Sequence, residues 1–178
     1  THGFQIWVNL PAKNKMMAPR YQEIPAKESP TVRDEGIWAR VIAGECLGVS
    51  SSIDTVIPIT LIHVKMEEGS VLIQEIAPDL NAMIYVFGGR VKLEDPLSVR
   101  NHPLPFGLGA KQFVSDGELG LLSQGGEIEI KSESESEFLI LAGPEINEPI
   151  ARYGPFVMNT REEIHQAFSD FQNGRFAS

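Results

Sequence analysis

Short apolar runs separated by turn residues limit most strongly how this chain can fold. Eight such runs follow Gly36, at residues 37–43, 57–66, 70–76, 82–93, 111–115, 119–122, 127–131 and 138–142. The segments between them contain glycine, proline and charged residues and have no helical period. Regularly spaced strands without helices between them are typical of a sandwich or barrel. The sequence therefore predicts an all-β domain.

One helix is predicted near the end of the chain. Thr160 and Glu163 have the spacing of a capping box, and Gly174 lies where a helix would end. Apolar residues recur between them with helical spacing, at Ile164, Ala167, Phe168 and Phe171. Such an apolar stripe must be covered, either by this chain or by a neighbouring domain.

The first 30 residues differ from the rest. Residues 4–10 alternate apolar and polar side chains, which predicts a strand with one buried face. Residues 11–30 have no sustained period and read as a connector, so a domain boundary is expected there. Because the strand begins so early and no initiator Met precedes it, we expect the chain to be part of a longer protein.

Charge and cysteine content narrow the function classes. With 15 basic and 24 acidic residues the net charge is −9, which disfavours direct binding to nucleic acid. No apolar run reaches the roughly 18 residues of a membrane span. The single cysteine, Cys46, cannot form an internal disulfide and favours a reducing compartment. We expect a soluble intracellular protein of the cytoplasm, the nucleus or both.

No catalytic constellation is predicted. The histidines at positions 2, 63, 102 and 165 lie far apart in the sequence, and we interpret His63 as a packed or rim residue rather than a metal ligand. Cys46 is interpreted as a structural thiol. The alternating Ser-Glu run at residues 132–137 reads as an exposed turn.

Two long motifs give the chain a family resemblance. Residues 3–17 (GFQIWVNLPAKNKMM) with 19–23 (PRYQE), and residues 143–150 (GPEINEPI) with 153–164 (YGPFVMNTREEI), resemble the pirins. Pirins are bicupins, in which the first of two jelly-roll barrels carries an iron on three His and one Glu. Those ligands all precede the strand that here begins at Phe4, so the chain resembles a pirin C-terminal half.

The resemblance implies an all-β fold, a cupin jelly-roll barrel with one C-terminal α-helix. It also implies three segments. Residues 1–30 would be the strand and linker at the junction of the two pirin halves, residues 31–155 the C-terminal cupin domain, and residues 156–178 a helical tail.

Cupin metal motifs can be compared with this sequence directly. The first, G-x5-H-x-H-x3-E-x6-G, meets Gly69, Glu75, Ala77, Asn81 and Gly88, and the second meets Gly117, Ser123, Gly125 and Ile128. The glycines are kept, but every ligand is replaced. We expect Ala77 and Ile128 to face the barrel interior, where neither can hold a divalent ion. No metal ligand and no cofactor are therefore predicted in this chain, and iron is expected only in a pirin N-terminal half.

The leading hypothesis is a metal-free structural and interaction module. Its expected partner is a pirin N-terminal cupin domain or a second copy of this chain, with no direct nucleic-acid or membrane contact. The residues predicted to make these contacts are Phe4, Ile6, Trp7, Phe156, Val157, Met158, Ile164, Phe168 and Phe171.

Three alternatives stay open. Intact pirins are linked to iron-dependent dioxygenase activity of the quercetin 2,3-dioxygenase type, and this chain could be part of such an enzyme. Nuclear pirins act as transcriptional co-regulators through protein contacts. The empty barrel could instead bind a small apolar ligand in a cavity lined by Leu72, Ala77, Tyr85 and Ile128.

Overall fold

The computed structural model of the chain describes residues 3–93 and 112–175, apart from the side chains of residues 123 and 124. It divides into two compact units. The first consists of residues 1–22 and 146–178, and the second of residues 23–145. Each unit has its own apolar core and is described separately.

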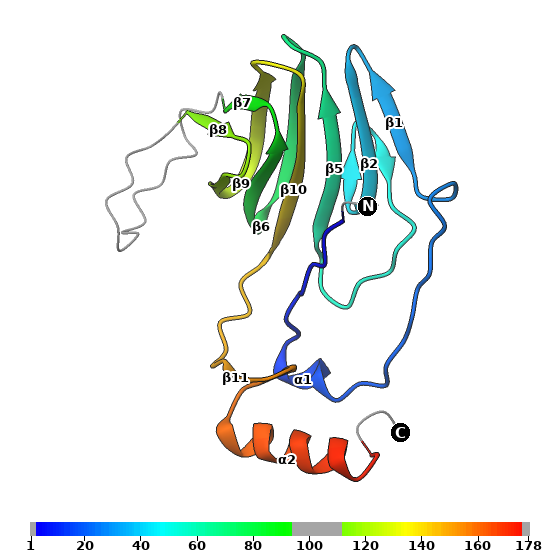
Figure 1. Cartoon of the computed structure of the whole chain (residues 1–178), viewed down its shortest axis with the longest axis vertical. Coiled ribbons are helices and arrows are strands. Elements are labelled where there is room, and N and C mark those ends of the chain that lie inside the picture. Colours follow the sequence, from blue (N-terminus) through cyan, green and yellow to red (C-terminus); the bar gives the residue numbers. More distant parts are fainter. Residues whose placement is uncertain (1–2, 94–111, 176–178) are drawn as a thin grey trace. The chain divides into compact units, whose positions relative to one another are not determined.

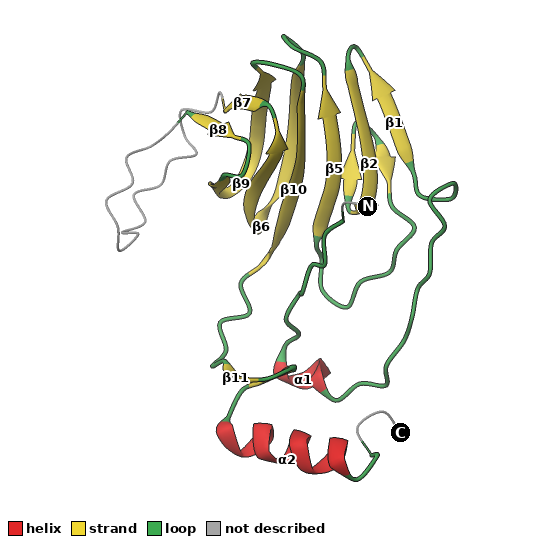
Figure 2. Ribbon diagram, viewed as in Figure 1, coloured by secondary structure: helices red, strands yellow, loops and turns green. Residues whose placement is uncertain are grey.

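The second unit is built on one eight-stranded antiparallel sheet (Figures 1 and 2). Its strand order is β1-β2-β5-β10-β6-β9-β7-β8. The bounds are β1 Thr31–Asp34, β2 Ile37–Ala43, β5 Thr60–Met66, β6 Val71–Gly88, β7 Arg90–Leu93, β8 Phe113–Ser115, β9 Leu119–Ser132 and β10 Ser136–Pro144. A separate two-stranded ribbon pairs β3 (Glu45–Cys46) with β4 (Val49–Ser50).

One face of this sheet forms a single core. Buried residues from β2 at one side of the sheet and from β7 and β8 at the other belong to the same apolar cluster, so the sheet curves around it. Within the described residues β1 and β8 remain edge strands, and the ladder of hydrogen bonds does not close into a barrel. The all-β prediction is confirmed, with an open sheet in place of a closed one.

Strict alternation makes the two faces of the central strands different. In β2 every second residue from Ile37 to Ala43 is buried, and those between are half-buried. In β5 the buried residues are Ile62, Val64 and Met66. Because side chains alternate across a strand, His63 and Lys65 must lie on the opposite face. The bounds predicted for the first run, residues 37–43, match β2 at both ends.

A close backbone approach accompanies an irregularity in the pairing of the two longest strands, β6 and β9. The register between β6 and β9 shifts between Ile76 and Asn81. There Gly125 has a φ of +64°, and a Cβ atom on it would lie 2.5 Å from the Cα of Pro78. Only glycine allows both the left-handed backbone and this contact.

The first unit contains one substantial helix. Its elements are α1 (Ala12–Lys15), β11 (Ala151–Tyr153), β12 (Phe156–Met158) and α2 (Arg161–Gln172), with β11 and β12 paired. The predicted capping box is present, because the Thr160 hydroxyl accepts from the Glu163 N–H and the Glu163 carboxylate accepts from the Thr160 N–H. Neither described helix is both long and apolar enough to span a bilayer.

The predicted strand at residues 4–10 is wrong. These residues belong to no strand in the structure, and Phe4, Ile6, Trp7 and Val8 are exposed. Alternation describes a side-chain pattern, whereas a strand also needs a neighbouring edge to bind its N–H and C=O groups. Two of the four histidines, His2 and His102, lie outside the described residues.

Candidate functional site

The cupin ligand positions on β6 face differently from the prediction. Gln74 and Ile76 are buried in the core, whereas Glu75 and Ala77 are exposed. The expectation that Ala77 faces the interior is therefore wrong. A shift of one residue turns every side chain of a strand to its other face, and the spacing counted from Gly69 was off by one.

The core positions of this region carry almost no metal-binding chemistry. Leu72, Ile76, Leu80 and Ile128 are apolar and buried. Gln74 is the one polar side chain among them. Its Nε2 donates to the backbone carbonyl oxygen of Glu45 at 3.0 Å and to that of Glu75 at 2.8 Å. Its Oε1 is buried and has no hydrogen-bond partner among the residues that the structure describes. One amide oxygen among aliphatic side chains does not fit a divalent ion.

The other proposed ligand positions offer no replacement. Asn81 is half-buried and donates to the Glu145 carboxylate at 3.0 Å, and the Glu75 carboxylate is on the exposed face. In the described part of the chain no three His, Cys, Asp or Glu side chains come together as a metal site would require. The cavity suggested for an apolar ligand is also not supported, because Leu72 faces the core and Ala77 the outside.

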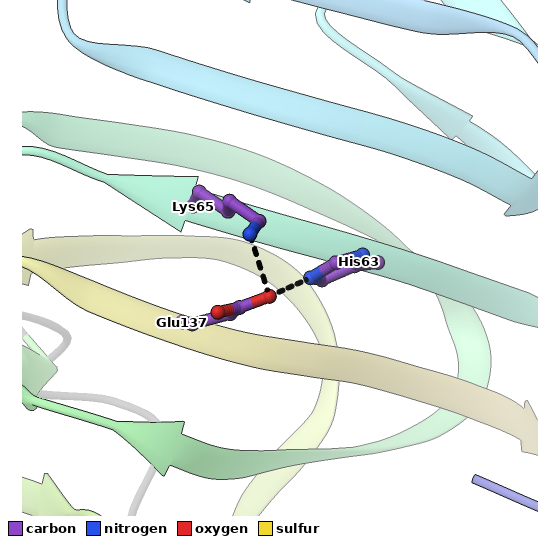
Figure 3. Close-up of polar contacts among 3 residues, drawn as sticks. All are labelled: His63, Lys65 and Glu137. Carbon is purple, nitrogen blue, oxygen red and sulfur yellow. Dashed lines mark hydrogen bonds and ion pairs between the residues drawn. The ribbon is translucent and has the colours of Figure 1, made fainter. Parts of the chain in front are cut away.

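The titratable cluster of the sheet lies on its outer face (Figure 3). His63 and Lys65 project from β5 toward Glu137 on β10 (Figure 3). Glu137 Oε1 lies 2.7 Å from His63 Nε2 and 3.0 Å from Lys65 Nζ. Lys65 and Glu137 are direct partners in the β5–β10 register, and His63 is two residues further along the same face.

Burial and charge act in opposite directions on this cluster. Partial burial lowers the pKa of His63 below its ordinary value of 6.5, although the hydrogen bond and the charge of Glu137 oppose this and Lys65 and Arg40 add to it. Burial alone would raise the pKa of Glu137. The hydrogen bonds from Lys65 and His63 outweigh it, so that pKa is lowered. The carboxylate is therefore held charged between a lysine and an imidazole.

Aromatic rings enclose the imidazole. Trp38 contacts His63 edge-on, with ring centroids 5.2 Å apart, and Phe87 lies 5.7 Å away on the other side. Arg40 and Lys65 are placed over the Trp38 ring, at 5.3 and 6.0 Å from its centroid. The interpretation of His63 as a packed rim residue is confirmed. Its pairing with Glu137, 74 residues away, had no signal in the sequence apart from the shared face of His63 and Lys65.

The remaining candidate residues have structural surroundings. Cys46 is buried in β3, and burial raises the pKa of its thiol to about 11, which agrees with a structural role. His165 is exposed on α2. The Ser-Glu run is an exposed turn only in part, because Ser132 and Ser136 are buried and their hydroxyls donate to the backbone oxygen of Ser134.

The residues predicted to contact a partner fall into two groups in the first unit. Phe156, Met158 and Ile164 are buried with Ala167 in this unit's own core, against which Phe168 packs. Val157 is half-buried, and the remaining four are exposed, with Trp7 at 61% and Phe171 at 63%; the other two are Phe4 and Ile6. The expected contact role of the whole set stays a prediction.

The fold and the motifs together define the class of this protein. The family model of the pirin C-terminal cupin domain matches residues 61–177, which assigns the sheet of the second unit to the cupins. Pirin from Mus musculus is 34% identical over 176 residues, which cover 98% of this chain and 57% of that protein. This chain belongs to the pirin family.

Two further comparisons agree with this assignment. A pirin-like protein from Caulobacter vibrioides is 36% identical over 177 residues, covering 98% of this chain and 58% of its own length. The crystal structure of quercetin 2,3-dioxygenase from Acinetobacter baumannii superimposes with a TM-score of 0.81 at 32% identity, over 97% of this chain and 56% of that one. The chain thus spans little more than half the length of these relatives.

Proposed function

We propose that this chain is the metal-free structural and interaction half of a two-barrel pirin. The observation that carries the proposal is the chemistry of the core at the cupin ligand positions. Ile76, Leu80 and Ile128 stand there with a single amide, Gln74, whose Nε2 already binds two backbone oxygens. Aliphatic side chains cannot replace imidazole or carboxylate ligands. Iron would then belong to the portion of the relatives that this chain does not match.

Metal content tests the first part of the proposal. The chain is loaded anaerobically with Fe(II), desalted and measured by elemental mass spectrometry, with a full-length pirin as the positive control. We expect iron at far below one equivalent in this chain and near one in the control. Stoichiometric iron that survives desalting would overturn the proposal, and Gln74→Leu would then show whether the core amide binds it.

The interaction role rests on exposed aromatic side chains in the first unit. Trp7 and Phe171 are more than half exposed, although large apolar side chains usually gain free energy by burial. Their proposed partner is a pirin N-terminal cupin domain, with a second copy of this chain as the other possibility. Association with nucleic acid or a membrane is not part of the proposal.

Mixing experiments separate these two partners. The chain is combined with a separately produced N-terminal half of a pirin relative, and light scattering reports the masses. We expect a one-to-one complex that Trp7→Ser or Phe171→Ser weakens. Tyr21→Ser is the matched control, because Tyr21 is 98% exposed but outside the predicted contact set. A homodimer without heterodimer would contradict the first partner, and monomers in both mixtures would contradict the interaction role.

A second candidate function is participation in a dioxygenase, favoured by the superposition on quercetin 2,3-dioxygenase. In that case the two halves together, supplied with Fe(II), would consume quercetin and dioxygen, and this chain would act by stabilising the other half. Quercetin loss measured for this chain alone is expected to equal that of the buffer. Activity of this chain by itself would contradict its assignment as non-catalytic.

The co-regulator function and an intracellular location, in cytoplasm or nucleus, complete the proposal as properties of the whole pirin. The co-regulator function would act through protein contacts, which agrees with the acidic net charge of −9. Localisation of a fluorescently tagged chain in cells checks the compartment, and exclusion from both compartments would contradict it.

A further inference from the structure

An open hollow with basic walls lies on the outer face of the sheet. It has a volume of about 580 Å³, and all its lining residues belong to the second unit. They are Ala26, Lys27, Ser29, Thr31, Arg33, Trp38, Arg40 and Lys65. Four cations and no carboxylate thus line one hollow of a chain whose net charge is −9.

Strand register brings these side chains together. Across β1, β2 and β5, Arg33 is paired with Trp38, which is paired with Lys65. The next row of the same face pairs Thr31 with Arg40. Because adjacent strands lie about 4.8 Å apart and successive rows on one face about 7 Å apart, the long side chains of arginine and lysine in neighbouring rows can reach one ligand. The ladder of the sheet therefore fixes Arg33, Arg40 and Lys65, whereas Lys27 lies in the turn segment before β1.

The deepest cation is held in place with donor capacity to spare. The Arg40 guanidinium lies over the Trp38 ring, and its Nε is buried without a hydrogen-bond partner in the described part of the chain. A buried donor without an acceptor is unfavourable, and because this Nε has almost no accessible surface, an anionic oxygen would satisfy it only after the guanidinium turns toward the hollow. The hydroxyls of Ser29 and Thr31 add neutral donors to the same hollow.

Neighbouring carboxylates leave the positive character of the hollow in place. Glu137 binds Lys65 but is shared with His63, and Glu28 approaches Lys27 only at 3.9 Å between exposed side chains. A second hollow shares Arg33, Trp38 and Lys65 with the first and is lined also by Asp34, Glu35, Glu67 and Glu135. These acids repel an anion from that side, so a ligand is confined to the basic end.

We propose that this hollow binds a small organic anion that carries a phosphate group or at least two carboxylates. Guanidinium groups match the paired oxygens of both chemistries, and the volume lies in the range of small-molecule sites. The residues of this hollow lie outside the apolar core, so the inference does not depend on the proposed metal-free role.

Calorimetric titration with pyrophosphate, and separately with citrate, tests the site and distinguishes the two ligand chemistries. At low salt we expect saturable binding of at least one probe with a Kd below about 1 mM. Trp38 fluorescence, isolated by Trp7→Phe, is expected to change with the same midpoint. The absence of saturable binding of either probe, or binding that leaves Trp38 fluorescence unchanged, would overturn the proposal.

Three variants locate the binding. Arg40→Gln is expected to weaken it about tenfold or more, and the exposed Arg33→Gln about threefold. Lys13→Gln removes the same charge from an exposed position in the other unit and should leave the Kd within about twofold. Thermal melts verify that each variant is folded. If Arg40→Gln does not fold, Arg33→Gln still tests the site. Equal weakening by Lys13→Gln would show a general charge effect and contradict the site.

Discussion

The two faces of the eight-stranded sheet are built from the same strands and have opposite chemistry. On the inner face of β5, Ile62 and Val64 are completely buried in the apolar core. On its outer face, His63 and Lys65 bind Glu137, and Lys65 also lines a basic hollow. The difference arises from a displacement of one residue along the chain. The face where a cupin would bind metal is apolar, and the titratable groups lie on the other face.

This contrast separates stability from binding within one sheet. Inner-face side chains contribute area removed from water and tolerate little change. Outer-face side chains contribute charges and donors that remain near solvent, where each ion pair adds little to stability. Function of this domain should therefore be sought by altering the outer face, and the following predictions test that division from the largest effect to the smallest.

Truncation of a core aromatic should separate the faces most strongly. Phe138 on β10 is fully buried, and Phe138→Ala is expected to lower the free energy of unfolding by about 3–5 kcal/mol. Lys65→Ala, on the outer face, should cost about 1 kcal/mol or less. Urea denaturation followed by circular dichroism measures both, and similar losses for the two variants would contradict the division.

The thiol of Cys46, which belongs to the β3–β4 ribbon and packs in the same core as the inner face, should be protected from reagents. The raised pKa of Cys46, about 11, reduces the thiolate fraction at pH 8 about 100-fold relative to a thiol of pKa 9.0. Labelling with a thiol-specific disulfide reagent should be slowed by at least this factor in the native chain compared with the chain in urea. Equal labelling rates in the two states would show that the core around Cys46 is open to solvent.

Removing the Glu137 charge should change the titration of His63. Glu137 raises the pKa of His63 against the larger effect of burial, so Glu137→Gln should lower that pKa further. NMR titration of the imidazole measures it. The matched control is Glu133→Gln, in the exposed turn before β10, which should leave the pKa of His63 unchanged. A rise in the His63 pKa on Glu137→Gln would reverse the assigned electrostatics.

The same cluster sets the direction of an acid effect on stability. Since the His63 pKa lies below 6.5 in the folded state, the unfolded chain takes up the proton first, and stability should fall as the pH drops below about 6.5. The lowered pKa of Glu137 adds a further loss as the pH falls through 4.5 and below. His63→Gln should flatten the first of these losses in urea melts, and an unchanged slope would contradict it.

An exposed apolar side chain of the outer face should give the smallest effect. Leu121 on β9 is 57% exposed, so Leu121→Ser should change the free energy of unfolding by no more than about 0.5 kcal/mol. Urea denaturation again provides the measurement. A loss comparable with that of Phe138→Ala would mean that the outer face is covered in solution.

Regular local patterns made much of the fold predictable. The apolar run at residues 37–43 corresponds to β2 at both ends, and the Thr160–Glu163 capping box marks the start of α2. Both features depend on neighbours within a few residues, which the sequence displays directly. The strand expected at residues 4–10 is not formed, because alternation is also a local pattern and does not supply the partner edge that a strand needs.

The candidate sites were harder to predict because they depend on register. The face of Ala77 was assigned from motif spacing, and an error of one residue reversed it. The contact of Glu137 with His63 exists only because β10 pairs with β5, across 74 residues of sequence. The cation cluster similarly needs β1, β2 and β5 side by side.

The amino-acid sequence alone shows that this chain consists mainly of strands followed by a helix and that it is acidic. It also shows the motifs of the pirin family, without cupin metal ligands at the expected spacing. Those properties follow from residue type and short-range order. Only the three-dimensional packing shows which face of each strand is buried in the core. It also shows which charged residues, distant in the sequence, come into contact on the outer face. Hydrogen-bonded register joins residues that the chain separates, and no local pattern encodes which strands become neighbours.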